Sequence, residues 1–247
     1  MAETRYQPQT RTGATAFVDE GLRSYMLKVY NYMGAGLAIT GIAAILTFMA
    51  AVDTSGATAA LTPFGQALFT SPLKWVVVLA PVAMVFFLSF RIQTLSVQTA
   101  QMLFWVYAAL MGLSFASLGL VYTHGSIARV FLITAGTFGA MSLYGYTTKR
   151  DLTGWGSFLF MGLIGLIIAS LVNIFFASSA MTFVLSVVGV LIFTGLTAYD
   201  TQKIKEMYYA ADDGTVMGRK AIMGALSLYL DFINLFLSLL RLFGNRN

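Results

Sequence analysis

The amino-acid sequence predicts an all-α polytopic membrane protein, folded as a bundle of seven transmembrane helices. Of its 247 residues, 58% are hydrophobic and only 10% are charged, whereas a soluble domain carries about 25% charged residues. The apolar residues form blocks long enough to cross a bilayer as helices, which takes about 20 residues. Blocks such as 158–176 lack the period-two alternation that a membrane barrel requires. These observations exclude a water-soluble domain and favour membrane helices.

Seven apolar blocks follow one another along the chain. Residues 1–26 carry charged side chains without an early apolar core, so we expect a disordered polar tail there and a transmembrane domain over residues 27–247. Pro81 interrupts the second block, and residues 177–180 form a tight turn between the fifth and the sixth. The predicted spans are 27–52, 75–90, 100–122, 127–146, 155–176, 181–199 and 221–243.

The basic residues orient the bundle. With the N-terminus inside, eleven Lys and Arg residues fall on inner segments and four on outer ones. Because these residues concentrate in cytoplasmic loops, the count favours a cytoplasmic N-terminus. Seven spans then place the C-terminus outside, unless the last span is re-entrant. The net charge of +5 is explained by this asymmetry, so we expect no nucleic-acid partner. The absence of cysteine excludes disulfides and thiol chemistry.

Two pairs of small residues are candidate packing sites between helices. Gly112 precedes Ala116 by four residues, and Gly165 precedes Ala169 by four. Small residues at this spacing let helix backbones approach closely in lipid. We expect both pairs to pack against neighbouring helices.

Two aspartates, Asp200 and Asp231, stand in or against the apolar spans. Asp231 lies about ten residues from either end of the last span, and Ser227 and Asn234 share its helical face at i−4 and i+3. Burying an ionised aspartate in a membrane costs about 2.5–3.5 kcal/mol or more, so such a residue needs a partner, water or a proton. A purely structural hydrogen bond to a neighbouring helix would also explain Asp231.

Asp200 closes the sixth span on its inner side, with Lys203 at i+3 as an alternative ion-pair partner. If Asp200 and Asp231 face the same inner half of the bundle, the two carboxylates cannot both ionise freely and would share a proton. The pair would form a proton switch or an oxygen site for a hard cation such as Ca²⁺. Arg91, which ends the second span, either offsets a carboxylate charge or simply reaches the inner interface.

Three stretches of the chain resemble the Bax inhibitor-1 family, in its bacterial branch. Residues 142–152 (SLYGYTTKRDL) are similar to the family's fourth-span exit, residues 193–204 (FTGLTAYDTQKI) to its sixth-span signature, and residues 230–236 (LDFINLF) to its last helix. The likeness covers nearly the whole chain. It implies a seven-helix fold with a central C-terminal helix, in a bacterial inner membrane.

The resemblance also implies an activity, namely a pH-sensitive leak of calcium ions across the membrane. By that resemblance, Asp200 and Asp231 are the carboxylate pair that senses pH and gates the leak. They are also the candidate calcium ligands, and Arg91 is a candidate latch on the pair. The expected partners are Ca²⁺, protons and the lipid bilayer, with no cofactor other than a bound Ca²⁺.

Other functional classes remain open at this point. Some bacterial relatives in the family restrain a membrane-anchored ATP-dependent protease, so a non-conducting regulator is the alternative, with the tail and residues 205–220 as contact surfaces. Proton-coupled transport would use the same two aspartates. We expect no enzyme, because the residues before Asp231 lack the glycines of an intramembrane aspartyl protease and no phosphate-binding loop or HExxH sequence is present.

Overall fold

The computed structural model describes residues 11–53 and 60–247, with side chains of the first helix from Glu20 onward. The first ten residues, which belong to the predicted polar tail, lie outside the described residues. The elements in chain order are α1 (Arg11–Ala51), β1 (Val52–Asp53), β2 (Ala60–Leu61), α2 (Pro63–Phe69), α3 (Leu73–Arg91), α4 (Val97–Phe115), α5 (Leu118–Val121), α6 (His124–Thr147), α7 (Thr153–Phe176), α8 (Ser179–Glu206) and α9 (Gly214–Phe243).

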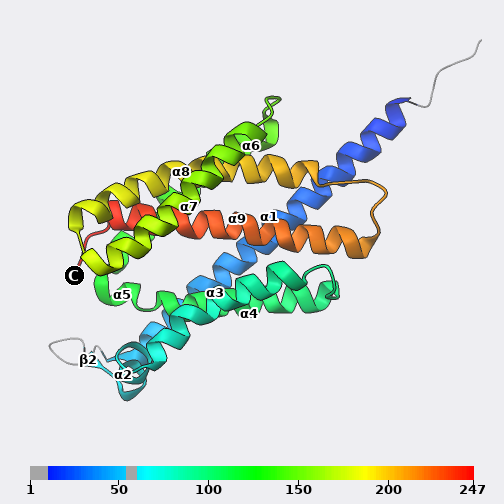
Figure 1. The fold of residues 1–247 in the computed structure, drawn as a ribbon. Coiled ribbons are helices and arrows are strands. Elements are labelled where there is room, and N and C mark those ends of the chain that lie inside the picture. The colour runs from blue at the N-terminus through cyan, green and yellow to red at the C-terminus, as the bar shows by residue number, and fades with distance from the viewer. Residues whose placement is uncertain (1–10, 54–59) are drawn as a thin grey trace, which may run out of the picture.

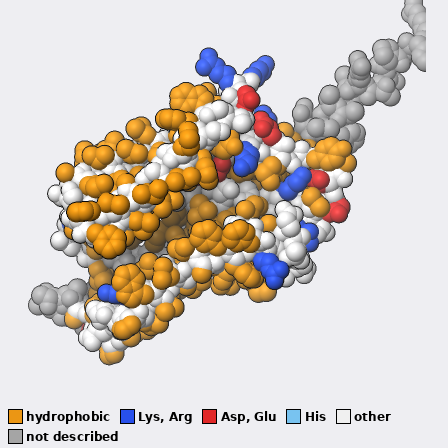
Figure 2. Space-filling model, in the orientation of Figure 1, with side chains coloured by type: hydrophobic (Ala, Val, Ile, Leu, Met, Phe, Trp, Pro, Cys, Tyr) orange, Lys and Arg blue, Asp and Glu red, His pale blue; other side chains and the backbone are white. Residues whose placement is uncertain are grey.

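Within the described residues, seven helices are long and apolar enough to cross a membrane. The polytopic all-α fold class predicted from the sequence is therefore confirmed. The seven are the 20–51 part of α1, then α3, the α4–α5 segment, α6, α7, α8 and α9. Charged side chains gather at the end of the bundle where α1 begins, and hydrophobic ones cover most of the rest of the visible face (Figure 2).

The helices extend beyond several predicted boundaries. The first helix begins at Arg11, and Tyr25 and Met26 are already buried in the core, so the packed bundle starts before residue 27. Pro81 stands inside α3 without ending it, which membrane helices tolerate. The turn after α7 is confirmed, because Ala177 adopts a left-handed conformation with φ of 46° and the Asn173 side chain accepts a hydrogen bond from the Ser178 amide.

Helix α9 is the centre of the bundle. In its most apolar stretch 72% of the residues are buried, against 6% in α7. It packs against α1, α4, α6 and α8, while α3 lies outside α4 and α7 lies outside α8 (Figure 1). Hydropathy alone does not tell which of these two helices is central, since both are apolar enough to span a membrane. Of the two, only α9 is surrounded by other helices. The central last helix that the resemblance implied is present.

Small residues set the spacing of the helices only where two backbones meet. A Cβ added at Gly112 would lie 2.4 Å from the carbonyl oxygen of Thr40, so α4 touches α1 there. Gly165, in contrast, has open space at its Cβ position. The prediction of close packing holds for the first pair, whereas Gly165 faces outward because α7 lies at the rim of the bundle.

The two-stranded hairpin and the C-terminus lie at the opposite end of the bundle from the start of α1 (Figure 1). The strands β1 and β2 are antiparallel, with Val52 paired to Leu61 and Asp53 to Ala60. The last residues are fixed there by hydrogen bonds from the Asn247 amide to the Val121 carbonyl and from the Thr123 amide to the Asn245 carbonyl. Helix α9 thus crosses the bundle fully, and the re-entrant alternative does not describe it.

Candidate functional site: a carboxylate pair on α8 and α9

Asp200 lies within α8 rather than at its end. The helix continues to Glu206, seven residues beyond residue 199, where the sixth span was predicted to end. The hydroxyl groups of Thr197 and Thr201 donate to the carbonyls four residues before them, at Phe193 and Thr197, so these polar residues satisfy themselves within the helix. The sequence pattern marked the end of the apolar stretch, which is not the end of the helix.

Helix α8 is held firmly on both sides of Asp200. A Cβ at Gly145 would lie 2.1 Å from the carbonyl oxygen of Ala198, which shows that the α6 and α8 backbones are in contact. Beyond Asp200, the Gln202 amide accepts a hydrogen bond from the Leu152 amide (2.8 Å) and donates one to the Arg150 carbonyl (2.8 Å). These contacts fix the rotation of α8 and hence the direction in which Asp200 points.

Asp231 lies at the middle of the central helix and is 5% exposed. Its Oδ2 atom is buried and has no hydrogen-bond partner among the described residues. A buried polar atom of this kind costs about 1–3 kcal/mol, so its retention at the centre of a packed helix calls for a functional reason. The purely structural explanation, a carboxyl group fully hydrogen-bonded to a neighbouring helix, does not fit this atom.

The structure brings Asp200 and Asp231 together. They line one cavity of about 830 Å³ bordered by α7, α8 and α9. In the view of Figure 2 the molecule is hollowed between α7 and the α3–α4 pair, over the position that α9 occupies in Figure 1. The hairpin topology predicted that these residues would face the same region, and packing of α8 on α9 brings them there.

A polar stripe on α9 faces this cavity. Ser227, Asp231, Asn234 and Ser238 recur at intervals of three or four residues and all line it, so they stand on one face of the helix. At 1.5 Å per residue the stripe extends for about 16 Å. The Asn234 amide nitrogen donates to the Leu230 carbonyl (2.8 Å), which leaves its side-chain oxygen available. The sequence had identified Ser227 and Asn234, and Ser238 continues the same face.

As a cation site, the pair supplies two carboxylates. Ca²⁺ takes six to eight oxygen ligands, which proteins commonly provide as carboxylates, amide oxygens and waters. Within the described residues no group of three or more His, Cys, Asp or Glu side chains is gathered anywhere. A calcium ion at the pair would therefore keep several waters, which suits transient passage rather than tight storage.

The two basic residues considered as partners of the aspartates form no ion pair with them. Lys203 makes no ion pair with Asp200, and its ammonium group lies 5.8 Å from the centre of the Tyr199 ring. Arg91 is exposed at the end of α3, a helix that packs mainly on α4 and α2 rather than on α8 or α9. Neither the interfacial ion pair nor the contact expected of a latch is present, and the latch role of Arg91 stays a prediction.

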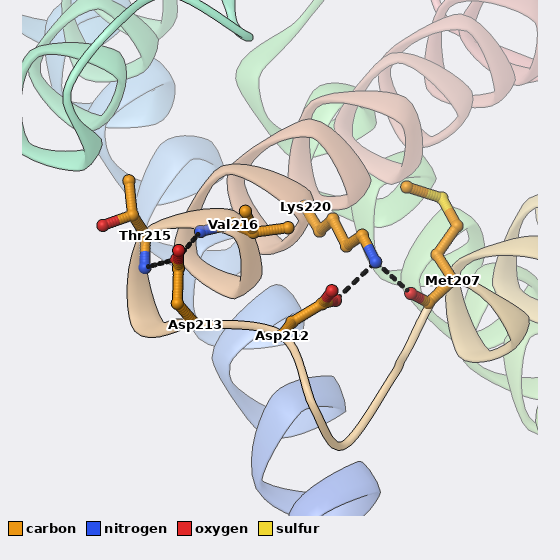
Figure 3. Close-up of polar contacts among 6 residues, drawn as sticks. All are labelled: Met207, Asp212, Asp213, Thr215, Val216 and Lys220. Atoms are coloured by element: carbon orange, nitrogen blue, oxygen red, sulfur yellow. Dashed lines mark hydrogen bonds and ion pairs between the residues drawn. The ribbon is translucent and has the colours of Figure 1, made fainter.

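The loop between α8 and α9 is ordered by its own polar contacts. Lys220 donates to the Met207 carbonyl (2.9 Å) and forms an ion pair with Asp212 (Figure 3). The Asp213 carboxylate accepts hydrogen bonds from the Thr215 and Val216 amides and so caps α9 (Figure 3). The loop therefore sets where α9 begins and how it enters the bundle.

The sequence did not predict a second polar contact of α9, which lies outside the aspartate cavity and joins α9 to α1 and α4. The Tyr229 hydroxyl lies 2.7 Å from the Thr40 hydroxyl, which in turn is 2.9 Å from the Ala108 carbonyl. All of this is buried, and the Tyr229 ring packs edge-on against Phe104 and Tyr107. These residues come from α1, α4 and α9, and nothing in the sequence links an isolated threonine to a tyrosine 189 residues away.

A seven-span bundle in which two aspartates of the last two helices line one cavity defines a class of polytopic membrane protein. Residues 22–247 match the family described as "Inhibitor of apoptosis-promoting Bax1". The chain belongs to this family, the Bax inhibitor-1 family.

Several relatives match almost the whole chain, and some of them are named as membrane proteins. The chain is 50% identical to the inner membrane protein YbhL of Escherichia coli K12 over 228 residues, covering 92% of this chain and 93% of the relative. It is 52% identical to a protein of Rickettsia prowazekii over 239 residues, covering 96% of each chain. A membrane protein of Streptococcus pyogenes is 36% identical over 93% of this chain and 96% of its own.

Proposed function

We propose that this protein is a pH-sensitive leak for calcium ions in a bacterial inner membrane, with its N-terminus in the cytoplasm. Asp200 and Asp231 are the sensor and the gate. The observation that carries the proposal is the meeting of two carboxyl groups in one intramembrane cavity, where one oxygen of Asp231 has no partner among the described residues. Intramembrane acids of this kind mark ion and proton pathways.

The proposed mechanism depends on one proton. While the pair shares it, the carboxyl groups attract each other and hold α8 against α9. When the proton leaves, two negative charges face each other in a poorly hydrated site and repel. Either the helices separate, or a divalent cation takes the place of the proton. The polar stripe on α9 then offers oxygen atoms to a partly hydrated ion along about 16 Å of the membrane.

Calcium flux into dye-loaded liposomes tests the proposal. We expect a sigmoidal dependence on pH between about pH 5 and 8, and we expect Asp200→Asn and Asp231→Asn to remove or shift it. Glu206→Gln is the matched control, because Glu206 is an exposed acid on the same helix that does not line the cavity. Flux that is unchanged in Asp231→Asn would sink the proposed gate.

The absence of flux at any pH would favour the alternative function, a non-conducting regulator of a membrane-anchored protease. The α8–α9 loop offers the exposed Tyr209 as a contact residue. Co-purification with the partner that survives both Asp→Asn changes, and is lost when the loop is altered, would support that function.

A further inference from the structure

A second groove lies between α1 and α6, away from the carboxylate pair. Its volume is about 700 Å³, which is within the range of small-molecule pockets. One wall carries Arg23, Tyr30 and Gly34 from α1, and the other carries Gly139 and Tyr146 from α6. Most of the remaining lining is apolar, and both helices are membrane spans. The groove is thus part of the surface that the protein presents to lipid.

The groove has one charged end. Arg23 lies near the beginning of the first span, is exposed, and forms no ion pair with any residue that the structure describes. A second cation, Lys205, contacts the groove residue Tyr146: its ammonium group lies 5.3 Å from the centre of the Tyr146 ring and donates to the Tyr146 carbonyl. Two cations at the membrane boundary, with an apolar groove leading inward from them, match an anionic headgroup with an acyl chain.

The length of the groove agrees with one lipid leaflet. Arg23 and Gly34 are eleven residues apart on α1, which is about 16 Å along the helix. Half of a hydrocarbon core of about 30 Å is about 15 Å. The groove therefore ends near the middle of the membrane, where an acyl chain from the same leaflet also ends.

Glycines keep the deep part of the groove wide. A Cβ added at Gly34 or at Gly139 would meet no atom within 4 Å. Neither glycine is there to let two helices touch, unlike Gly145, which lies on α6 but faces α8. Larger side chains at these two positions would fill the groove instead of displacing a helix.

The polar floor of the groove is connected to the helix that carries Asp200. The Tyr30 hydroxyl lies 2.6 Å from the Ser142 hydroxyl, which lies 3.0 Å from the Thr201 hydroxyl. Thr201 directly follows Asp200 in α8. A molecule in the groove therefore contacts residues that are hydrogen-bonded to the helix of the carboxylate pair.

We propose that the α1–α6 groove is a binding site for an anionic phospholipid, with its phosphate at Arg23 and one acyl chain between Gly34 and Gly139. The proposal does not depend on calcium conduction. The lipid comes from the leaflet at the end of the bundle where α1 begins.

Native mass spectrometry of the delipidated protein after addition of phosphatidylglycerol or phosphatidylcholine tests this site. We expect Gly139→Leu and Gly34→Leu to lower the fraction of protein carrying phosphatidylglycerol at least fivefold. Gly136→Leu is the matched control, because Gly136 is on α6, also has open space at its Cβ position, and does not line the groove. Arg23→Gln should abolish the preference for phosphatidylglycerol, whereas Arg129→Gln at the opposite end of α6 should not.

Three results would overturn the proposal. Lipid binding unchanged in both leucine variants would show that the groove is not the site. Equal binding of the two lipids by the wild-type protein would remove the role of Arg23. A wild-type dimer that becomes monomeric in Gly139→Leu without losing lipid would show that a second copy of the chain occupies the groove.

Discussion

Ionising both members of the carboxylate pair should destabilise the folded protein. Asp231 is 5% exposed and shares its cavity with Asp200. If the two charges stand about 3.5–4 Å apart in this cavity, they repel by roughly 4–5 kcal/mol at an effective dielectric constant of about 20. The unfolded chain separates the two groups and avoids this repulsion. Stability should therefore be greatest where the pair holds a proton, and it should be lost as the pH rises.

Thermal unfolding in detergent micelles, followed by tryptophan fluorescence, measures this effect. We expect the apparent midpoint to fall by several °C between about pH 5 and 8. Since 1 kcal/mol corresponds to about 2–4 °C in a chain of this size, roughly 5 kcal/mol limits the fall to about 20 °C. Asp151 does not contribute in this interval, because hydrogen bonds from Thr153 hold the pKa of its carboxyl below its usual range and keep it ionised.

Single substitutions identify the source of the pH dependence. Asp231→Asn and Asp200→Asn each leave only one carboxyl group in the cavity, so the repulsion is removed and the fall in the midpoint should become clearly smaller in both variants. The remaining fall reports the cost of ionising one buried carboxyl group. Glu206→Gln should keep the wild-type dependence. If Asp231→Asn retains the full fall in midpoint between low and high pH, the repulsion between the two carboxylates is not its cause and the reasoning is refuted.

Three further substitutions test the packing that positions the pair. Gly145→Ala should lower the free energy of unfolding by about 1–3 kcal/mol, because its Cβ would lie 2.1 Å from the Ala198 carbonyl oxygen. A wild-type midpoint in the same thermal assay would contradict the contact between α6 and α8. Tyr229→Phe removes the hydroxyl that contacts Thr40 and should cost about 0.5–1.5 kcal/mol; a variant as stable as the wild type would show that this contact adds nothing. Lys220→Met removes the polar contacts that order the α8–α9 loop. Chymotrypsin should therefore cleave this loop several-fold faster in the variant than in the wild type. An unchanged cleavage rate would mean that other contacts order the loop.

Helix ends show where prediction from composition fails. The apolar pattern places the end of the sixth span at Asp200, yet α8 continues to Glu206. Hydropathy reports where a helix leaves lipid, but backbone hydrogen bonding decides where it ends. The same difference explains why α1 begins at Arg11, well before its apolar stretch.

The pair of aspartates was predicted as a functional site, because acids are rare and costly within apolar spans. Their shared cavity was not settled by the sequence. It required α8 to be rotated correctly, and that rotation depends on Gly145 meeting Ala198 and on Gln202 joining the α6–α7 connection. These contacts join residues about 50 positions apart, and local periodicity carries no information about them.

By itself the sequence determined the class of protein, the number of spans and the two acids that need an explanation, because lipid imposes length and polarity on every span independently of its neighbours. Only the tertiary structure decided which helix is central, which small residues are contacts and which face open space, and where cavities lie. Gly112 and Gly165 have the same local pattern, but one touches α1 and the other meets nothing. In lipid an apolar helix face is equally suited to acyl chains and to another helix, so burial is settled by packing complementarity between distant segments.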